Sequence, residues 1–339
     1  MFSTRPRFTP TDALLLLVVT IWGSNFTVVK ATLEQIPPLG FNALRLALAC
    51  LVLVVVARCS GATVPDRADW PRLVGLGLAG HCGYQLSFIL GLARTSVTNS
   101  SLILGCLPVT VLLLNAVSPR REPVGRWQWV GVGLAIVGVY LVVGVGAQVA
   151  RDTMLGDLLI IGSVWCWGWY TIGARRLLRR YTPLQLTACT TVIGAAAFLP
   201  FAVPSLISLD WGGVTWWAWV ATAGSGVLAL SLAYVLWYTG VQRLGSARTS
   251  VYSNLVPVVA IVVAAITLGE SLSVIKAFGV ALVLTALVLT RIEVPVRPGC
   301  APSAVYYQPS SRASSSGQHG ATDPGSNSGR GTWRRCSPN

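Results

Sequence analysis

Ten runs of mostly apolar residues, each about 20 residues long, follow one another through the first 292 positions of the chain. An α-helix of that length crosses the hydrocarbon core of a bilayer, and the runs are too long for barrel strands. Backbone groups in hydrocarbon must find their hydrogen-bond partners inside the protein. The runs therefore predict an all-α integral membrane protein with ten transmembrane helices. These cover residues 12–32, 38–58, 71–92, 98–118, 127–149, 155–174, 183–206, 215–239, 246–268 and 272–292.

The composition agrees with a chain surrounded by lipid. Only 11% of the residues are charged and the mean hydropathy is +0.66, whereas a soluble domain has about 25% charged residues. The 25 Lys and Arg residues outnumber the 11 Asp and Glu residues. They stand in short loops between the apolar runs, and not on a long basic helix or among interleaved aromatic residues. We therefore expect the lipid bilayer as a partner and no nucleic acid.

The loop charges also predict an orientation. With a cytoplasmic N-terminus, the cytoplasmic segments before residue 293 contain fourteen Lys and Arg residues and the outer loops contain four. This bias predicts a protein of the cell (plasma or inner) membrane with both termini in the cytoplasm. Residues 1–11 are expected to be a short cytoplasmic lead, and no signal peptide is expected because nine further spans follow the first. Residues 293–339, rich in Ser, Gly, Pro and Arg, predict a disordered cytoplasmic tail.

Two stretches of equal length resemble each other. Residues 91–108 and residues 240–257 share Gly, Arg, Ser and Pro at the same relative positions and end at Pro108 and Pro257. Each begins at the end of one apolar run and continues into the middle of the next. Four identities in eighteen positions mean little alone, and they indicate an internal duplication only together with the rest of the chain, which repeats around them.

The duplication extends over the whole apolar region. Further pairs align at offsets between 145 and 149 positions, namely residues 22–30 with 167–175 and residues 122–131 with 270–279. We predict a first repeat at residues 12–149 and a second at residues 155–292, each with five helices. Because five is odd, the second repeat must enter the membrane from the opposite side. Inverted repeats of this kind are a common plan of secondary transporters.

On these residues the chain resembles the EamA type of the drug/metabolite transporter superfamily, which has two five-helix repeats. The matching features include WGSNFTVVK in the first predicted helix, Arg45 in the second, and the proline-centred fourth and ninth helices. LGESLSVIKAFGVALVLTALVL near the end of the second repeat and Gly156-Asp157 at the start of the sixth helix also match. The resemblance covers residues 12–292. It implies transport of a small molecule, often export of a metabolite, and in some members of amino acids or drugs.

Aromatic residues mixed with a few polar ones are typical of a small-molecule binding surface. They occur at helical spacing on the third predicted helix and its counterpart, and on the first and sixth helices. We predict that the substrate cavity is lined by Trp22, Asn25, Arg45, His81, Tyr84, Gln85, Ser100, Trp167, Tyr170, Tyr234, Trp237 and Asn254. For Gly23, Gly168 and Gly173 we favour close helix packing.

Two of these candidates have more than one interpretation. Arg45 stands alone among apolar residues, where a charge must face the protein interior or water. It either binds an anionic group such as a carboxylate, or it snorkels to the headgroups or pairs with backbone carbonyls. Its counterpart in the second repeat is Thr190, so the duplication does not require an arginine. Histidine is the side chain whose ordinary pKa lies nearest neutral pH, so His81 is a candidate for coupling transport to protons, but a hydrogen-bonded packing role is the favoured interpretation.

Pro108 and Pro257 lie in the middle of the predicted fourth and ninth helices. Proline removes a backbone donor and bends a helix, and in a membrane the freed carbonyl needs a new partner. Because both repeats contain this proline beside polar residues, we favour a hinge or cavity-lining role over a kink that only improves packing.

The sequence shows no pattern for catalysis or metal binding. Eight cysteines and two histidines are scattered without metal-site spacing or a disulfide framework, and no phosphate-binding loop occurs. The carboxylates Asp12, Glu122, Asp157 and Glu270 stand at the ends of predicted spans. We therefore expect no metal, no cofactor and no enzymatic activity.

The expected function is secondary transport of a small organic solute, with export by alternating access between the repeats. An amino-acid-like solute or a drug is a candidate substrate. An uncoupled channel or exchanger of the same architecture is the first alternative, an intramembrane enzyme the second, and a receptor or scaffold the third. The substrate, the coupling ion and the oligomeric state do not follow from the sequence.

Overall fold

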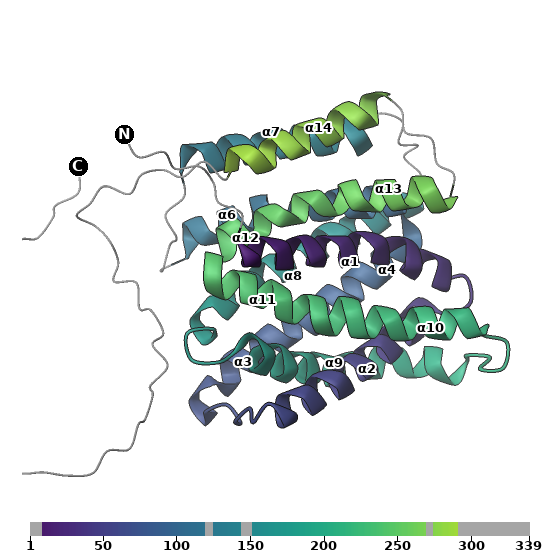
Figure 1. The fold of residues 1–339 in the computed structure, drawn as a ribbon. Helices are drawn as coiled ribbons and strands as arrows, with labels where there is room; N and C mark the ends of the chain where they lie inside the picture. The colour runs from purple at the N-terminus through teal and green to yellow at the C-terminus, as the bar shows by residue number, and fades with distance from the viewer. Residues whose placement is uncertain (1–8, 119–124, 144–150, 269–273, 291–339) are drawn as a thin grey trace, which may run out of the picture. The chain divides into compact units, whose positions relative to one another are not determined.

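The computed structural model describes residues 9–118, 125–143, 151–268 and 274–290. Within these ranges the chain forms helices and their connections and no β-strand (Figure 1). Local sequence explains where several helices begin. Thr9 accepts the backbone N–H of Asp12, whose carboxylate accepts the N–H of Thr9, and Thr182 and Gln185 repeat this arrangement. Such reciprocal caps pair the donors that a helix N-terminus leaves free.

The helices are named in chain order, with η for a short 3-10 or π-helical segment. They are α1 (Pro10–Thr32), α2 (Pro38–Cys59), η1 (Arg67–Asp69), α3 (Trp70–Gly77), η2 (Leu78–Gly83), α4 (Tyr84–Arg94), α5 (Val97–Gly105), α6 (Leu107–Val117), α7 (Arg126–Val143), α8 (Arg151–Leu177), α9 (Pro183–Ile207), α10 (Trp216–Gly224), η3 (Ser225–Leu232), α11 (Ala233–Leu244), α12 (Ser246–Val251), η4 (Tyr252–Leu255), α13 (Val256–Leu268) and α14 (Val274–Thr290).

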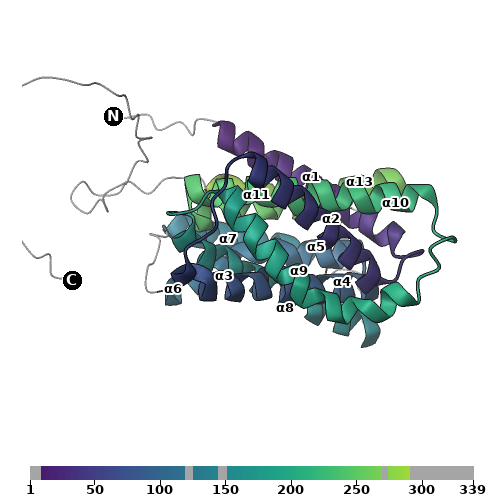
Figure 2. The same cartoon turned by 90° about the horizontal axis from the view of Figure 1, so that it is seen from below.

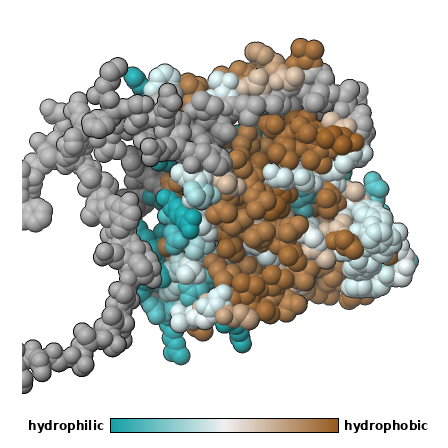
Figure 3. Space-filling view, viewed as in Figure 1, coloured by the Kyte–Doolittle hydropathy of each residue, from teal (hydrophilic) through white to brown (hydrophobic). Residues whose placement is uncertain are grey.

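Seven helical stretches of the described residues are long and apolar enough to cross a membrane. They are Pro10–Thr32, Pro38–Cys59, Arg67–Arg94, Asn99–Val117, Pro183–Ile207, Trp216–Leu244 and Ser246–Thr267, and each coincides with a predicted span. The other three predicted spans fall on α7, α8 and α14, which are helical but shorter or less apolar over the described residues. Figure 3 shows a broad band of hydrophobic surface between more hydrophilic ends. The chain is a multi-pass membrane protein.

Two π-helical segments interrupt these stretches at matching places. η2 lies between α3 and α4, and η3 lies between α10 and α11. Moving η2 along the chain by the repeat offset of 149 positions places it on residues 227–232, inside η3. A π-turn adds one residue to a helical turn, shifts the register of the side chains that follow, and occurs often at functional sites.

The predicted fourth and ninth helices are also interrupted. α5 ends at Gly105 and α6 begins at Leu107, while the 3-10 segment η4 separates α12 from α13, which begins at Val256. The sequence analysis placed Pro108 and Pro257 inside continuous helices. In the structure each proline stands in the first turn of a new helical segment, where a missing N–H costs no hydrogen bond.

Helices from the two halves of the chain pack against each other in a reciprocal pattern (Figures 1 and 2). α1 contacts α11 and α13, and α8 contacts α4 and α6. α2 packs on α9, and α7 lies side by side with α14. The first helix of each half therefore packs against the third and fourth helical stretches of the other half.

Polar side chains tie helix ends together at both ends of α8. Near its N-terminus, Asp157 accepts a hydrogen bond from Thr95, and Lys30 donates to the Thr95 carbonyl at 2.8 Å. Beyond its C-terminus, Arg180 pairs with Asp66 and Asp69 at 2.7 and 2.6 Å. The contacts of Asp157 and of Arg180 connect the two halves of the chain, while that of Lys30 holds Thr95 within the first half.

Several helix crossings require glycine. A Cβ atom at Gly23 would lie 2.6 Å from Cβ of Val259, and one at Gly173 would lie 2.6 Å from Cδ2 of Leu76. At Gly168 the nearest atom, Cγ2 of Thr110, would be 2.7 Å away. The predicted packing role of these three glycines is confirmed.

We expect Gly194→Ala to lower the thermal stability. Its new Cβ would lie 2.2 Å from Cβ of His81 and 2.6 Å from the carbonyl oxygen of Gly77, and overpacking of this kind costs about 1–3 kcal/mol. The measurement is the midpoint of thermal unfolding, Tm, in detergent. Gly133→Ala is the control, because its Cβ would meet nothing within 4 Å. Equal Tm values for the two variants would contradict the close crossing.

Candidate functional site

A cavity lies where helices of both halves meet. Its described lining residues come from α1, α2, α4, α5, α6 and α8 and from η3, α11, η4 and α13. They are Trp22, Asn25, Phe26, Arg45, Tyr84, Gln85, Phe88, Leu104, Leu107, Trp167, Ala229, Leu230, Tyr234, Ser253 and Val256. The space inside is about 40 Å³, which is enough for a few water molecules.

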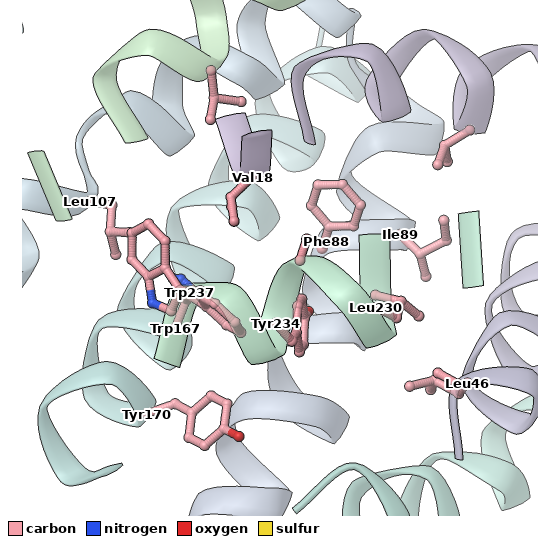
Figure 4. Close-up of a cluster of buried hydrophobic side chains, with 14 of the residues drawn as sticks. Val18, Leu46, Phe88, Ile89, Leu107, Trp167, Tyr170, Leu230, Tyr234 and Trp237 are labelled. Carbon is pink, nitrogen blue, oxygen red and sulfur yellow. The ribbon is translucent and has the colours of Figure 1, made fainter. Parts of the chain in front are cut away.

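Aromatic rings form much of the cavity wall. Trp22 lies edge-on to Trp167 with ring centroids 5.7 Å apart, and Trp167 lies 4.8 Å from Tyr234. Trp237 packs behind Trp22 at 5.2 Å. Figure 4 shows Trp167, Tyr234, Trp237 and Phe88 gathered in this cluster. Edge-to-face and tilted contacts of this kind hold rings in fixed positions.

The π-helical segment η3 brings a backbone group to the cavity. The indole N–H of Trp22 donates to the carbonyl of Ala229 at 3.0 Å, and Ala229 and Leu230 both line the cavity. On the same helix pair, Ser225 donates to the side-chain oxygen of Asn25. The first helix is thus anchored to η3 by two hydrogen bonds from side chains.

Arg45 is the one charged residue among the described lining residues. Its side chain is buried, with 1% of its surface exposed, and its guanidinium lies over the ring of Phe41 at 5.1 Å. Its Nε and Nη1 have no hydrogen-bond partner, and it takes part in no ion pair among the described residues. Gln85 lies nearby in the lining and donates to the hydroxyl of Tyr234 at 3.0 Å, while its side-chain oxygen is unpaired.

His81 lies outside the cavity lining, in a small buried network. Its Nε2 is 3.1 Å from the hydroxyl of Tyr170 and 3.2 Å from that of Thr190, and these two hydroxyls are 2.6 Å apart. All three side chains are fully buried, and the partners of His81 Nε2 are neutral hydroxyl groups. This geometry agrees with a packing role, and proton coupling through His81 stays a prediction.

The structure brings seven of the twelve predicted residues to the cavity wall. These are Trp22, Asn25, Arg45, Tyr84, Gln85, Trp167 and Tyr234. The other five lie outside the lining. His81 and Tyr170 form the buried network, Trp237 packs on Trp22, and Ser100 and Asn254 are buried without a hydrogen-bond partner for their side chains.

The sequence analysis missed the apolar part of the wall and one serine. The additional residues are Phe26, Phe88, Leu104, Leu107, Ala229, Leu230, Ser253 and Val256. Phe88 follows the candidate Tyr84 by four positions, a helical spacing that could have found it. The others carry no signal that separates them from lipid-facing or core residues. Ser253 lies in the 3-10 segment η4, which the sequence analysis did not predict.

A second, larger hollow lies near the C-terminal ends of α8 and α11. It measures about 530 Å³, and Arg175, Arg176 and Arg179 are among its described lining residues. On α8 the lining of the cavity and that of the hollow are separated by five positions, from Trp167 to Ile172, or about 7.5 Å of helix.

Known proteins resemble this chain over most of its length. The sequence model of the EamA-like transporter family matches residues 9–144 and 154–292. YyaM of Bacillus subtilis, an "Uncharacterized transporter", is 28% identical over 277 residues, which are 80% of this chain and 90% of that one.

Two relatives have names that include a substrate. A "Probable terminal-alkyne amino-acid exporter" of Streptantibioticus cattleyicolor is 30% identical over 258 residues, covering 76% of this chain and 85% of that one. A "Probable amino-acid metabolite efflux pump" of Escherichia coli is 28% identical over 291 residues, covering 81% and 92%. A solved crystal structure has the same fold, with a TM-score of 0.67 at 18% identity over 83% of this chain and 98% of that one.

We expect Trp22→Phe to lower Tm, because it removes the hydrogen bond that the Ala229 carbonyl accepts. A hydrogen bond of this kind contributes about 1 kcal/mol. The control is Trp165→Phe, which changes the same groups at a side chain that is 46% exposed on α8. The same Tm for both variants would show that the bond between α1 and η3 contributes nothing to stability.

Proposed function

Because this chain belongs to the EamA-like transporter family, we propose that it exports a small organic solute by alternating access between two inverted five-helix repeats. The family description and the names of the relatives point to a transporter and not to an enzyme. In this proposal the repeats are residues 12–149 and 155–292, with a short cytoplasmic lead before them and a cytoplasmic tail at 293–339. The protein would lie in the cell membrane with both termini inside.

The reciprocal packing of the two halves supports the inverted repeat. α1 contacts α11 and α13 while α8 contacts α4 and α6, as expected if a two-fold axis in the membrane plane exchanges the halves. The π-helical segments η2 and η3 and the interruptions before Pro108 and Pro257 also recur at equivalent places. Ten spans then follow from counting α7, α8 and α14 together with the seven more apolar stretches.

The size of the cavity is the observation that carries the proposal. Both halves contribute aromatic and polar side chains to it, but its 40 Å³ is far below the 300–1,000 Å³ or so of a site for a small molecule. A solute can therefore enter only if helices move apart. The interruptions fall in the third, fourth, eighth and ninth of the ten predicted spans. They are the natural points of movement, which supports hinge roles for Pro108 and Pro257.

Aromatic side chains next to the cavity are an argument for a gate on one of its sides. Along α8, Tyr170 stands between Trp167 of the cavity and Ile172 of the hollow, and along α11, Tyr238 stands between Tyr234 and Val241. The rings of Tyr170 and Tyr238 have centroids 4.8 Å apart, and Trp167 lies 6.1 Å from Tyr238. By the loop charges the hollow is on the cytoplasmic side. Its 530 Å³ suits an entrance for a solute that is to be exported.

Two named relatives favour an amino-acid-like solute. One is named an amino-acid exporter and the other an amino-acid metabolite efflux pump, and we extend that substrate class to this chain. An uncoupled exchanger is the second candidate function. It is favoured by the lack of any carboxylate among the described lining residues, because a proton-driven transporter often relays protons through such groups.

Flux into proteoliposomes tests the proposal. We expect saturable transport of at least one amino-acid-like solute from a panel of amino acids, sugars and cationic drugs. Dependence on a pH gradient would favour proton coupling, and independence would favour the uncoupled exchanger. Folded protein that transports no solute of the panel would contradict the proposal.

Ala229→Leu provides the matched variant for this assay. The larger side chain fills a cavity of only 40 Å³, so we expect flux to fall by about tenfold or more. Ala47→Leu is the control, since Ala47 is exposed on the surface of α2. Equal flux from both variants would show that the solute does not pass through this cavity.

A further inference from the structure

The charge of Arg45 has no counterpart within the described structure. The side chain is 1% exposed, Nε and Nη1 are unpaired, and no described acidic residue forms an ion pair with it. A guanidinium does not give up its proton in proteins, so the charge persists. A buried, unpaired charge destabilises the state that contains it, and is retained where function needs it.

The two packing interpretations of Arg45 do not fit its surroundings. Snorkelling to the headgroups requires an exposed guanidinium, and this one is buried and lines the cavity. If Arg45 paired with backbone carbonyls, its N–H groups would donate hydrogen bonds to them. Its Nε and Nη1 have no hydrogen-bond partner among the described residues. The contact with the ring of Phe41 supplies a weak attraction only.

The repeat also shows that the scaffold does not need an arginine here. The equivalent position in the second half is Thr190, whose hydroxyl bonds to Tyr170 and His81 in the closed, neutral network. The two halves thus use equivalent positions differently. In the second half Thr190 packs within the protein, and in the first half Arg45 presents a charge to the cavity.

We propose that Arg45 binds the carboxylate of the transported solute, and that the site requires this carboxylate but no ammonium group. The inference rests on the proposed transport function and names its substrate class: monocarboxylates with an apolar or aromatic body, of which amino acids are a subset. The planar guanidinium matches the two oxygens of a carboxylate. The rings of Trp22, Trp167 and Tyr84 suit the apolar body.

The rest of the lining explains why the ammonium group is dispensable. The described lining residues include no Asp or Glu, so a cationic group would find only neutral acceptors such as the unpaired side-chain oxygen of Gln85. In the same cavity the charge of Arg45 repels a second cation. An amine without a carboxylate should therefore be rejected, and an acid without an amine accepted.

Three probes with the same phenyl body separate these requirements. They are phenylalanine, 3-phenylpropanoate, which lacks the amine, and phenethylamine, which lacks the carboxylate. Binding is read from the shift in Tm that each probe causes in the detergent-purified full chain, and transport from flux in proteoliposomes. We expect phenylalanine and 3-phenylpropanoate to raise Tm and to be transported, and phenethylamine to do neither.

Arg45→Gln tests the residue itself. We expect it to weaken binding of both acids by about tenfold or more. Arg45→Lys should weaken binding less, because the ammonium keeps the charge but cannot form the two parallel hydrogen bonds of a guanidinium. Without ligand, Arg45→Gln should leave Tm unchanged or raise it, since an unpaired charge is removed. Arg58→Gln, at the exposed end of the same helix, is the control and should alter neither property.

The outcomes separate this inference from the proposed function. Binding or transport of phenethylamine equal to that of phenylalanine would overturn it, as would a lowered Tm of ligand-free Arg45→Gln, which marks a structural arginine. Flux of another solute without any Tm shift from 3-phenylpropanoate would overturn the inference and leave transport standing. If no solute is transported, the Tm shifts still decide whether Arg45 binds a carboxylate.

Discussion

Hydrocarbon offers no hydrogen-bond partner to a peptide group, so every interruption of a membrane-spanning helix must be satisfied by the protein itself. Over the residues that the structure describes, membrane-spanning helices are interrupted four times, at η2, η3, η4 and the junction between α5 and α6. The hydrogen bond from Trp22 to the carbonyl of Ala229 in η3 shows how such a place can be stabilised. The cavity lies beside these interruptions because irregular backbone at membrane depth is tolerated only inside the protein.

The interruptions and the packing together are compatible with the opening that we propose for this site. Reciprocal contacts hold α1 and α8 against the other half. Hydrogen bonds near the N-terminus of α8 and ion pairs beyond its C-terminus stabilise its two ends. The cavity between them is almost filled by its own aromatic rings. A solute would replace ring-to-ring contacts by its own, which links binding to the separation of the halves.

The sequence predicted the helices well because hydrophobic length is a strong signal, and the family because the repeat spacing is specific. It predicted aromatic and polar wall residues such as Trp22, Arg45 and Gln85 because these types stand out in an apolar run. It did not predict η2 and η3, since a π-turn has no residue signature and only shifts the register. Leu104 and Val256 were missed because an apolar wall residue has the same sequence signal as a core or lipid-facing one. His81, in η2, was placed in the cavity although it lies in a buried network.

The central claim is that one cavity between the halves opens to each side in turn. The direct measurement is the reaction of Ala229→Cys, in a chain without its eight native cysteines, with a membrane-impermeant thiol reagent added from one side or the other. The account predicts labelling from both sides and opposite changes when solute is added, with one rate rising as the other falls. Labelling from one side only, or equal changes from both sides, would contradict it.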